Sequence, residues 1–236
     1  MPPFSSEEDL IYKPEVAAEY SKSRELFNET DEKLFSEIHI LGVNGKVIVD
    51  FGCGDGRHLL RLKEEGAARV IGVDINPKMI EMAKQNSAAV LNTDFMVSNG
   101  KQTPLEAESA DLVVSNFMIH YFEDAQEIFN EISRVLKEGG HCVCTFNVTD
   151  VAPGSGHLYN TPMPIRLGSA EKPVMIDNLI KSSTELQVAI NEAGLVIEKG
   201  DVLHHPNAVV DDSFEHKNKV EKHAVMLVLR KLDKAA

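Results

Sequence analysis

Two aspartates, each at the end of an apolar run, flank three alternating glycines, and these residues are well suited to binding a polar ligand. Asp50 and Asp74 end the two runs, and Gly52, Gly54 and Gly56 lie between them. Glycines at alternate positions let the backbone turn with positive φ and let a ligand approach where a Cβ would intrude. A carboxylate about 20 residues past such glycines, at the end of a second strand, can accept hydrogen bonds from ribose hydroxyls. The pattern therefore predicts a nucleoside site that includes Asp74.

These residues must be positioned by a strand, a glycine turn, a helix and a second strand. The β-branched run 47–49 predicts a strand buried on both faces, and 69–74 predicts the second strand. Between them, 58–65 has the composition of a helix. Its first N–H groups would face the turn, which suits a polar or anionic ligand group. The glycine pattern is G-x-G-x-G and lacks the third glycine of dinucleotide folds, G-x-G-x-x-G.

The rest of the chain alternates further apolar runs with helical patterns, as an α/β domain does, and 236 residues are enough for one such domain. Asn76 and Pro77 predict a helix start, with Asn76 as the capping residue. The expected helices cover 14–27, 31–41, 58–65, a segment from 77, a segment ending at 137, and 182–193; the expected strands cover 47–49, 69–74, 95–97, 111–116, 141–146, 195–203 and 223–229.

Four motifs in order resemble the class I S-adenosylmethionine-dependent methyltransferases. They are Val-Asp-Phe-Gly-Cys-Gly-Asp-Gly at 49–56, Gly-Val-Asp-Ile-Asn at 72–76, the run 111–116 and Leu-Lys-Glu-Gly-Gly at 136–140. The resemblance covers roughly residues 40 to 150. It implies a Rossmann-like α/β fold: a mostly parallel seven-stranded sheet with its last strand antiparallel, and helices on both faces. It also implies S-adenosyl-L-methionine as cofactor and S-adenosyl-L-homocysteine as product.

A single methyltransferase domain over 1–236 follows from this resemblance. Its expected parts are N-terminal cap helices (1–45), a cofactor-binding core (46–146), a substrate-side insertion (147–181) and a C-terminal helix with strands (182–236). Since ligands bind at the carboxyl ends of strands in open parallel sheets, 115–121 should line the site. The expected cofactor-binding residues are Tyr20, Arg24, Asp50, Gly52, Cys53, Gly54, Asp74, Ile75, Met79, Asn99, Gly100, Ser115 and Asn116.

Several of these residues also have a structural interpretation. Tyr20 can pack within a surface helix, and Ile75 and Met79 can belong to the core. Asn99 departs from the family, which usually has an Asp that contacts the adenine amino group. An Asn can accept from that amino group and donate to a ring nitrogen, so the contact is chemically possible. The alternative is that Asn99-Gly100 is simply a turn.

His120 and Tyr121 are the candidates for a catalytic base. His120 suits this role because the ordinary pKa of a His lies near neutrality. Against this, a His-Tyr pair at this position is common in the family whatever the substrate, which favours a structural role for His120. In the proline-containing insertion, Tyr159 and Arg166 are the candidate substrate-binding residues, with ordinary loop solvation as the alternative.

Composition limits the partners. The formal net charge of -13 argues against binding a nucleic-acid phosphate backbone. The three cysteines lack metal-ligand spacing and are expected to be reduced thiols, and the polar stretch with His204, His205 and Asp211 is interpreted as a solvated loop, so no metal is predicted. No apolar run approaches the ~20 residues of a membrane span, which favours a cytoplasmic protein. A monomer or homodimer is expected.

The favoured function is in-line transfer of a methyl group to an O, N or C nucleophile of a small molecule. Such a displacement depends mainly on holding two reactants in line, so the acceptor half of the sequence need not contain a recognisable motif. Two alternatives stay open at this stage. One is an RNA (cap-like) or other macromolecule methyltransferase; the other is a non-catalytic or nicotinamide-cofactor-binding Rossmann-like protein.

Overall fold

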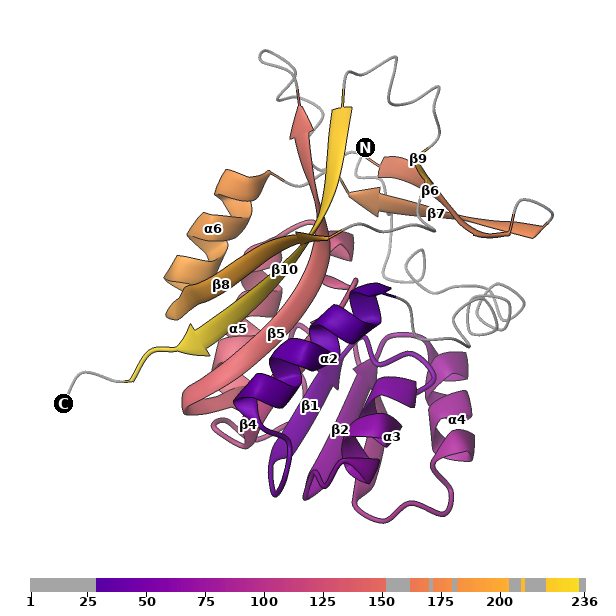
Figure 1. The fold of residues 1–236 in the computed structure, drawn as a ribbon, viewed down its shortest axis with the longest axis vertical. Coiled ribbons are helices and arrows are strands. Elements are labelled where there is room, and N and C mark those ends of the chain that lie inside the picture. The colour runs from indigo at the N-terminus through magenta and orange to yellow at the C-terminus, as the bar shows by residue number, and fades with distance from the viewer. Residues whose placement is uncertain are drawn as a thin grey trace.

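The computed structural model describes residues 29–151, 162–169, 172–179, 182–203, 209–210 and 220–233 (Figure 1). The predicted helix 14–27 and the candidate residues Tyr20, Arg24 and Tyr159 lie outside these ranges. His204, His205 and Asp211, the residues of the predicted solvated loop, also lie outside these ranges.

The described chain is organised on a seven-stranded sheet of order β3-β2-β1-β4-β5-β10-β8. β1 pairs in parallel with β2 and β4, and the parallel pairing continues to β3 on one side and β5 on the other. β10 is antiparallel to both of its neighbours, β5 and β8. The predicted sheet with an antiparallel last strand is therefore confirmed. The strands are β1 (Val47–Phe51), β2 (Arg69–Asp74), β3 (Thr93–Val97), β4 (Ala110–Asn116), β5 (Leu136–Val151), β8 (Leu195–Leu203) and β10 (Val220–Lys231).

Helices cover both faces of this sheet, as predicted. One buried cluster joins Leu34 and Phe35 of α2 to Leu59 of α3 and Ile80 of α4. The cluster on the opposite face includes Ile128 of α5 and residues of α6. The helices are α2 (Glu29–Leu41), α3 (Arg57–Glu64), α4 (Pro77–Asn86), α5 (Ala125–Val135) and α6 (Ser183–Glu192), with a short 3-10 helix η2 (Ile119–Tyr121) after β4. No helix in the described ranges is long and apolar enough to cross a membrane.

The insertion contains regular structure that the sequence did not indicate. β6 (Pro162–Ser169) and β7 (Lys172–Leu179) form an antiparallel pair, and β9 (Val209–Val210) completes a second sheet of order β7-β6-β9. Prolines lower the expectation of a strand because they give no N–H to a ladder, but they are tolerated at strand starts and edges. Figure 1 shows this second sheet to the right of the upper parts of β5 and β10, and β7 contacts η2.

Candidate functional site

A cavity lies at the carboxyl ends of β1, β2 and β4, where the strand order reverses between β1 and β4. This is the expected ligand position in an open parallel sheet. The predicted residues Gly52, Gly54, Asp74, Ile75, Met79, Asn99, Gly100, Asn116 and Tyr121 line it. The remaining lining residues are Phe51, Val73, Asn76, Ser98, Phe117, Met118 and Phe122.

The glycine turn has the left-handed backbone that its sequence predicts. Gly52, Gly54 and Gly56 have φ values of 82°, 55° and 81°. A Cβ on Gly52 would lie 2.8 Å from the Cβ of Met118, so the close approach of the wall requires glycine there. A Cβ on Gly54 would meet no atom within 4 Å, because this glycine faces the open cavity. Gly54 is therefore the position where the backbone itself is presented to a ligand.

Asp74 is oriented by two backbone donors. Its Oδ2 accepts from the Gly54 N–H at 2.9 Å, and its Oδ1 accepts from the Asn76 N–H at 2.8 Å. Burial is the largest influence on the Asp74 carboxyl and raises its pKa, while these two hydrogen bonds act in the opposite direction. Asn76 in turn caps α4, as predicted, by accepting from the Lys78 N–H at 2.9 Å. A carboxylate fixed in this way keeps lone pairs directed at the cavity for hydroxyl donors.

Three predicted cofactor-binding residues lie behind the cavity wall instead of in it. Asp50, Cys53 and Ser115 are all buried and are not among the lining residues. Burial, followed by the charge of Asp74, raises the pKa of Cys53 well above its ordinary value, so its thiol is a protonated packing group. Ser115 Oγ and both carboxylate oxygens of Asp50 have no hydrogen-bond partner within the described part of the chain.

Asp50 is the most unusual of these groups. It is 1% exposed and lies on the central strand, two residues before Gly52 of the glycine turn. Burial and the neighbouring charge of Asp74 raise the pKa of Asp50 to about 8. A buried carboxyl group without partners is costly, which is why it holds its proton in the ligand-free protein.

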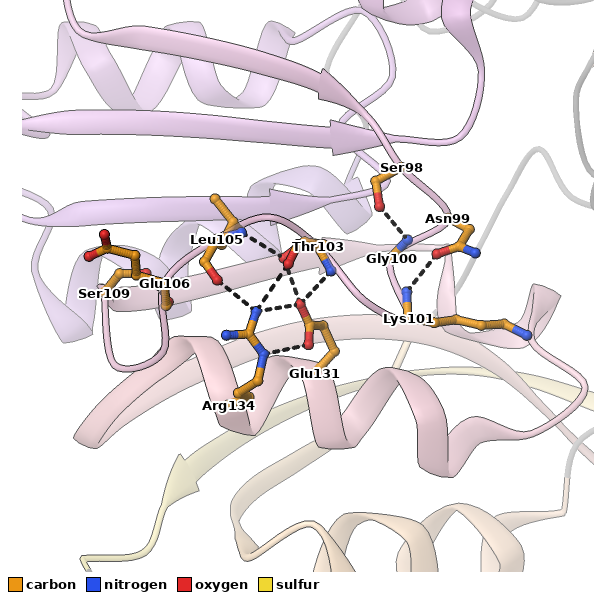
Figure 2. Close-up of polar contacts among 10 residues, drawn as sticks. All are labelled: Ser98, Asn99, Gly100, Lys101, Thr103, Leu105, Glu106, Ser109, Glu131 and Arg134. Carbon is orange, nitrogen blue, oxygen red and sulfur yellow. Dashed lines mark hydrogen bonds and ion pairs between the residues drawn. The ribbon is translucent and has the colours of Figure 1, made fainter.

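The loop after β3 brings Asn99 and Gly100 to the cavity, and it is folded as a turn (Figure 2). Asn99 Oδ1 accepts from the Lys101 N–H at 3.1 Å, and Ser98 Oγ accepts from the Gly100 N–H at 3.3 Å. Asn99 thus forms a turn and also lines the cavity, so its two interpretations are compatible.

An ion pair on α5 between the buried Glu131 and the partly exposed Arg134 fixes this loop from below (Figure 2). Glu131, 4% exposed, accepts from both the N–H and the hydroxyl of Thr103 at 2.8 and 2.6 Å. Arg134 donates to Glu131 and to the carbonyl oxygen of Leu105 at 2.8 Å. The loop is therefore clamped to a helix of the main domain, which keeps the Asn99 turn at the cavity.

His120 and Tyr121 occupy different positions. His120 is 2% exposed, its Nδ1 accepts from the Asn147 N–H at 3.4 Å, and its ring lies 4.6 Å from that of Tyr121. It does not line the cavity, whereas Tyr121 does. A catalytic role for either residue stays a prediction. Arg166 lies on β6, where only its backbone is described.

Sequence reasoning missed several lining residues. Phe51 and Val73 are at or near the ends of β1 and β2, directly before or after residues that were predicted, so proximity along the strand could have indicated them. Asn76 was assigned only a capping role, and it does both. Phe122 lies one residue beyond the predicted lining segment 115–121. Ser98 precedes Asn99, and no separate feature of the sequence distinguishes it.

Comparisons with known proteins agree with this geometry. Residues 49–144 match a family model described as a methyltransferase domain. A malonyl-[acyl-carrier protein] O-methyltransferase of Hahella chejuensis is 36% identical over 103 residues, which are 43% of this chain and 37% of that protein. The chain spans about half, or less, of the length of the curated relatives it matches.

Two solved structures show the similarity of fold. The geranyl diphosphate C-methyltransferase from Streptomyces coelicolor, in complex with S-adenosyl-L-homocysteine, has a TM-score of 0.64 at 19% identity, covering 85% of this chain and 77% of that chain. The [4+2]-cyclase SpnF has a TM-score of 0.66 at 16% identity, covering 89% and 84% of the two chains.

Proposed function

We propose that this chain, whose residues 49–144 match a methyltransferase domain model, is a class I S-adenosylmethionine-dependent methyltransferase that transfers a methyl group to a small-molecule O, N or C nucleophile. The observation that carries the proposal is the constellation of Asp74, Gly54 and Asp50 at one end of the sheet. It offers a fixed carboxylate for ribose hydroxyls, an open backbone position, and a buried acid without a hydrogen-bond partner among the described residues.

The described residues fit this cofactor. Asp74 would bind the ribose hydroxyls, Ile75 and Met79 would pack on the adenine, and Asn99 would face its polar edge. The buried carboxyl of Asp50 has no hydrogen-bond partner among the described residues and lies behind the cavity wall, so its charge would favour an amino acid ammonium group bound at that wall. No lysine or arginine of the described part lines the cavity, so its lining suits a ligand that carries positive charge. Bound there, S-adenosylmethionine supplies an activated methyl group on a sulfonium.

The residues after β4 would prepare the displacement. Phe117, Met118 and Phe122 form an apolar wall next to the glycine turn and would exclude water from the reacting atoms. The hydroxyl of Tyr121 and the side chain of Asn116 are the polar groups on this wall. They can orient an acceptor by hydrogen bonds, which is the main requirement of an in-line transfer.

A small-molecule acceptor is supported by the net charge of the chain and by the names of similar proteins. The chain has a net charge of -13, which opposes the approach of an RNA phosphate backbone. One relative is named as an arsenite methyltransferase, and one solved neighbour acts on geranyl diphosphate by its title. The monomeric or homodimeric state and the cytoplasmic location stay predictions.

The alternative with a specific observation behind it is a fold that binds the cofactor without methyl transfer. The solved neighbour SpnF is a [4+2]-cyclase by its title, at a TM-score of 0.66. Since fold does not establish activity, turnover has to be measured.

The proposal is tested by isothermal titration with S-adenosylmethionine, S-adenosylhomocysteine and NAD. We expect micromolar binding of the two sulfur nucleosides and no response to NAD. The test variant is Asp74→Asn, which should lose affinity for both sulfur nucleosides. The matched control is Asp94→Asn, which changes an exposed aspartate paired with Arg69 and should keep that affinity. Binding of NAD alone, or of none of the three, would contradict the proposal. Formation of S-adenosylhomocysteine with phenols, carboxylic acids or amines would then separate transfer from binding alone.

A further inference from the structure

At one corner of the cavity, four polar side chains from four elements meet. Asp31 of α2 accepts from the side-chain amide of Asn116 at 3.1 Å, and its same oxygen lies 3.2 Å from Nε2 of His58 on α3. Thr145 of β5 donates its hydroxyl to Oδ1 of Asn116 at 2.5 Å. Asp31 is 0% exposed, so this is a buried contact.

Asn116 is the member of this cluster that lines the cavity. Both ends of its amide are used: the nitrogen donates to Asp31, and the oxygen accepts from Thr145. An amide held at both ends has one orientation, because exchanging its oxygen and nitrogen would lose both bonds. Asp31 and Thr145 thus set which groups Asn116 can direct at a ligand.

The following residue, Phe117, adds strain to this corner. Its φ is 55°, in the left-handed region that residues other than glycine rarely occupy. Its N–H donates to the carbonyl oxygen of Thr145 at 2.9 Å and to the Thr145 hydroxyl at 3.0 Å. Such a conformation costs about 1–3 kcal/mol and persists only where neighbouring groups determine it. The cluster around Asn116 is that set of neighbours.

Attachment of α2 does not explain the buried acid. Leu34, Phe35 and Ile38 of α2 are fully buried in the core, and Glu37 of the same helix pairs with Lys199 of β8 at 2.5 Å. The helix is therefore anchored by apolar burial and by another ion pair. Burying a carboxylate at 0% exposure costs free energy unless its hydrogen bonds compensate. Asp31 is therefore not needed merely to attach α2.

We propose that Asp31 is a positioning residue, which fixes the Asn116 amide and through it the strained Asn116–Phe117 corner of the cavity. His58, the second residue of the helix after the glycine turn, holds the same carboxylate oxygen. Asp31 therefore links the helix that follows the glycine turn to the Asn116–Phe117 corner of the cavity. The effect on cofactor binding rests on the proposed function, whereas the effect on the corner does not.

The first test needs no ligand. Amide hydrogen exchange is measured by NMR at Phe117 and at Val49, a core residue of β1, in the wild type, Asp31→Ala and Asp31→Asn. We expect Asp31→Ala to raise the ratio of the Phe117 rate to the Val49 rate about tenfold. Asp31→Asn keeps an oxygen acceptor, so it should restore much of the ratio and keeps the test open if the alanine variant does not fold. Glu32→Ala, an exposed neighbour paired with Arg61, is the control and should leave the ratio unchanged. An unchanged ratio in Asp31→Ala would mean that Asp31 only stabilises the fold, and would overturn the proposal.

The second test is a double-mutant cycle with S-adenosylhomocysteine. We expect Asp31→Ala and Asn116→Ala each to weaken binding about tenfold, and the double variant to bind no more weakly than Asn116→Ala alone. Independent losses that add up in the double variant would overturn the proposal. A wild type that does not bind S-adenosylhomocysteine would remove the proposed function, and the exchange ratio would then decide on Asp31 by itself.

Discussion

Replacing Asp50 by asparagine should stabilise the ligand-free protein at neutral pH. The variant keeps the shape of the side chain but cannot ionise, and both oxygens of Asp50 lack partners within the described chain. Because the folded-state pKa is raised, to about 8 from 3.8, the folded protein holds a proton that the unfolded chain releases between these values. As far as it depends on Asp50, the free energy of unfolding is therefore highest below about pH 4 and falls as the pH rises towards 8.

The size of the effect follows from the same pKa. Each pH step within this window changes the free energy of unfolding by about 1.4 kcal/mol, so the wild type loses about 4 kcal/mol between pH 4 and pH 7 relative to Asp50→Asn. Urea unfolding followed by circular dichroism at pH 4.5, 6, 7 and 8 measures the difference between the two proteins. The exposed Asp201→Asn is the control and should give a small difference at every pH. A difference between Asp50→Asn and the wild type that does not vary with pH would refute the reasoning.

Ligand binding should respond in the opposite direction. In the proposed function the Asp50 carboxylate attracts the ligand ammonium group from behind the cavity wall, so Asp50→Asn should bind S-adenosylhomocysteine more weakly although it is more stable. Loss of function with gain of stability is typical of a residue retained for its ligand. Titration calorimetry measures the affinity, and an unchanged value would exclude Asp50 from the binding site.

Three further substitutions test the site and its support. Asp74→Ala should weaken S-adenosylhomocysteine binding at least tenfold in calorimetry while the protein stays folded, since it removes a charge-assisted acceptor; unchanged affinity would exclude Asp74. Gly54→Val should abolish that binding, because φ is 55° and the side chain would enter the cavity, and normal affinity would contradict the site. Burial alone would raise the pKa of Glu131, but hydrogen bonds from Arg134 and Thr103 lower it, so its contribution to stability is present above pH 4.5 and lost as the pH falls. Glu131→Gln should therefore lower the free energy of urea unfolding by about 2 kcal/mol at pH 7 and by less at pH 3, and an equal loss at both would be inconsistent with this.

The cofactor half of the fold could be predicted because its features are local. The run 47–49 is continuous and β-branched, and the structure extends it to β1, Val47–Phe51. Asn76 and Pro77 predict the start of α4, where Asn76 forms the expected cap. In each case neighbouring residues determine the conformation, so the local sequence is enough to predict the element.

The remainder depends on pairing between distant segments. β5 continues beyond the predicted 141–146 to Val151 because β10 pairs with it, as in Asn147 with Ala224 and Asp150 with Glu221. Polar residues in this extension hide the strand from an apolar pattern. The burial of His120 likewise depends on β5, because its ring accepts a hydrogen bond from the Asn147 N–H. No feature of the sequence 117–122 indicates which way that ring points.

Tertiary contacts also narrow the prediction of a polar or anionic ligand group at the glycine turn. The first N–H groups of α3 suggest an anion site when the sequence is considered alone. In the structure, the Gly54 N–H donates to Asp74 and the Arg57 N–H lies 3.4 Å from Oδ1 of Asp55. A pyrophosphate would have to displace these carboxylates and lie beside their charges, with Asp50 behind them. The turn therefore disfavours a dinucleotide and favours a ligand with cationic groups, such as the ammonium and sulfonium of S-adenosylmethionine.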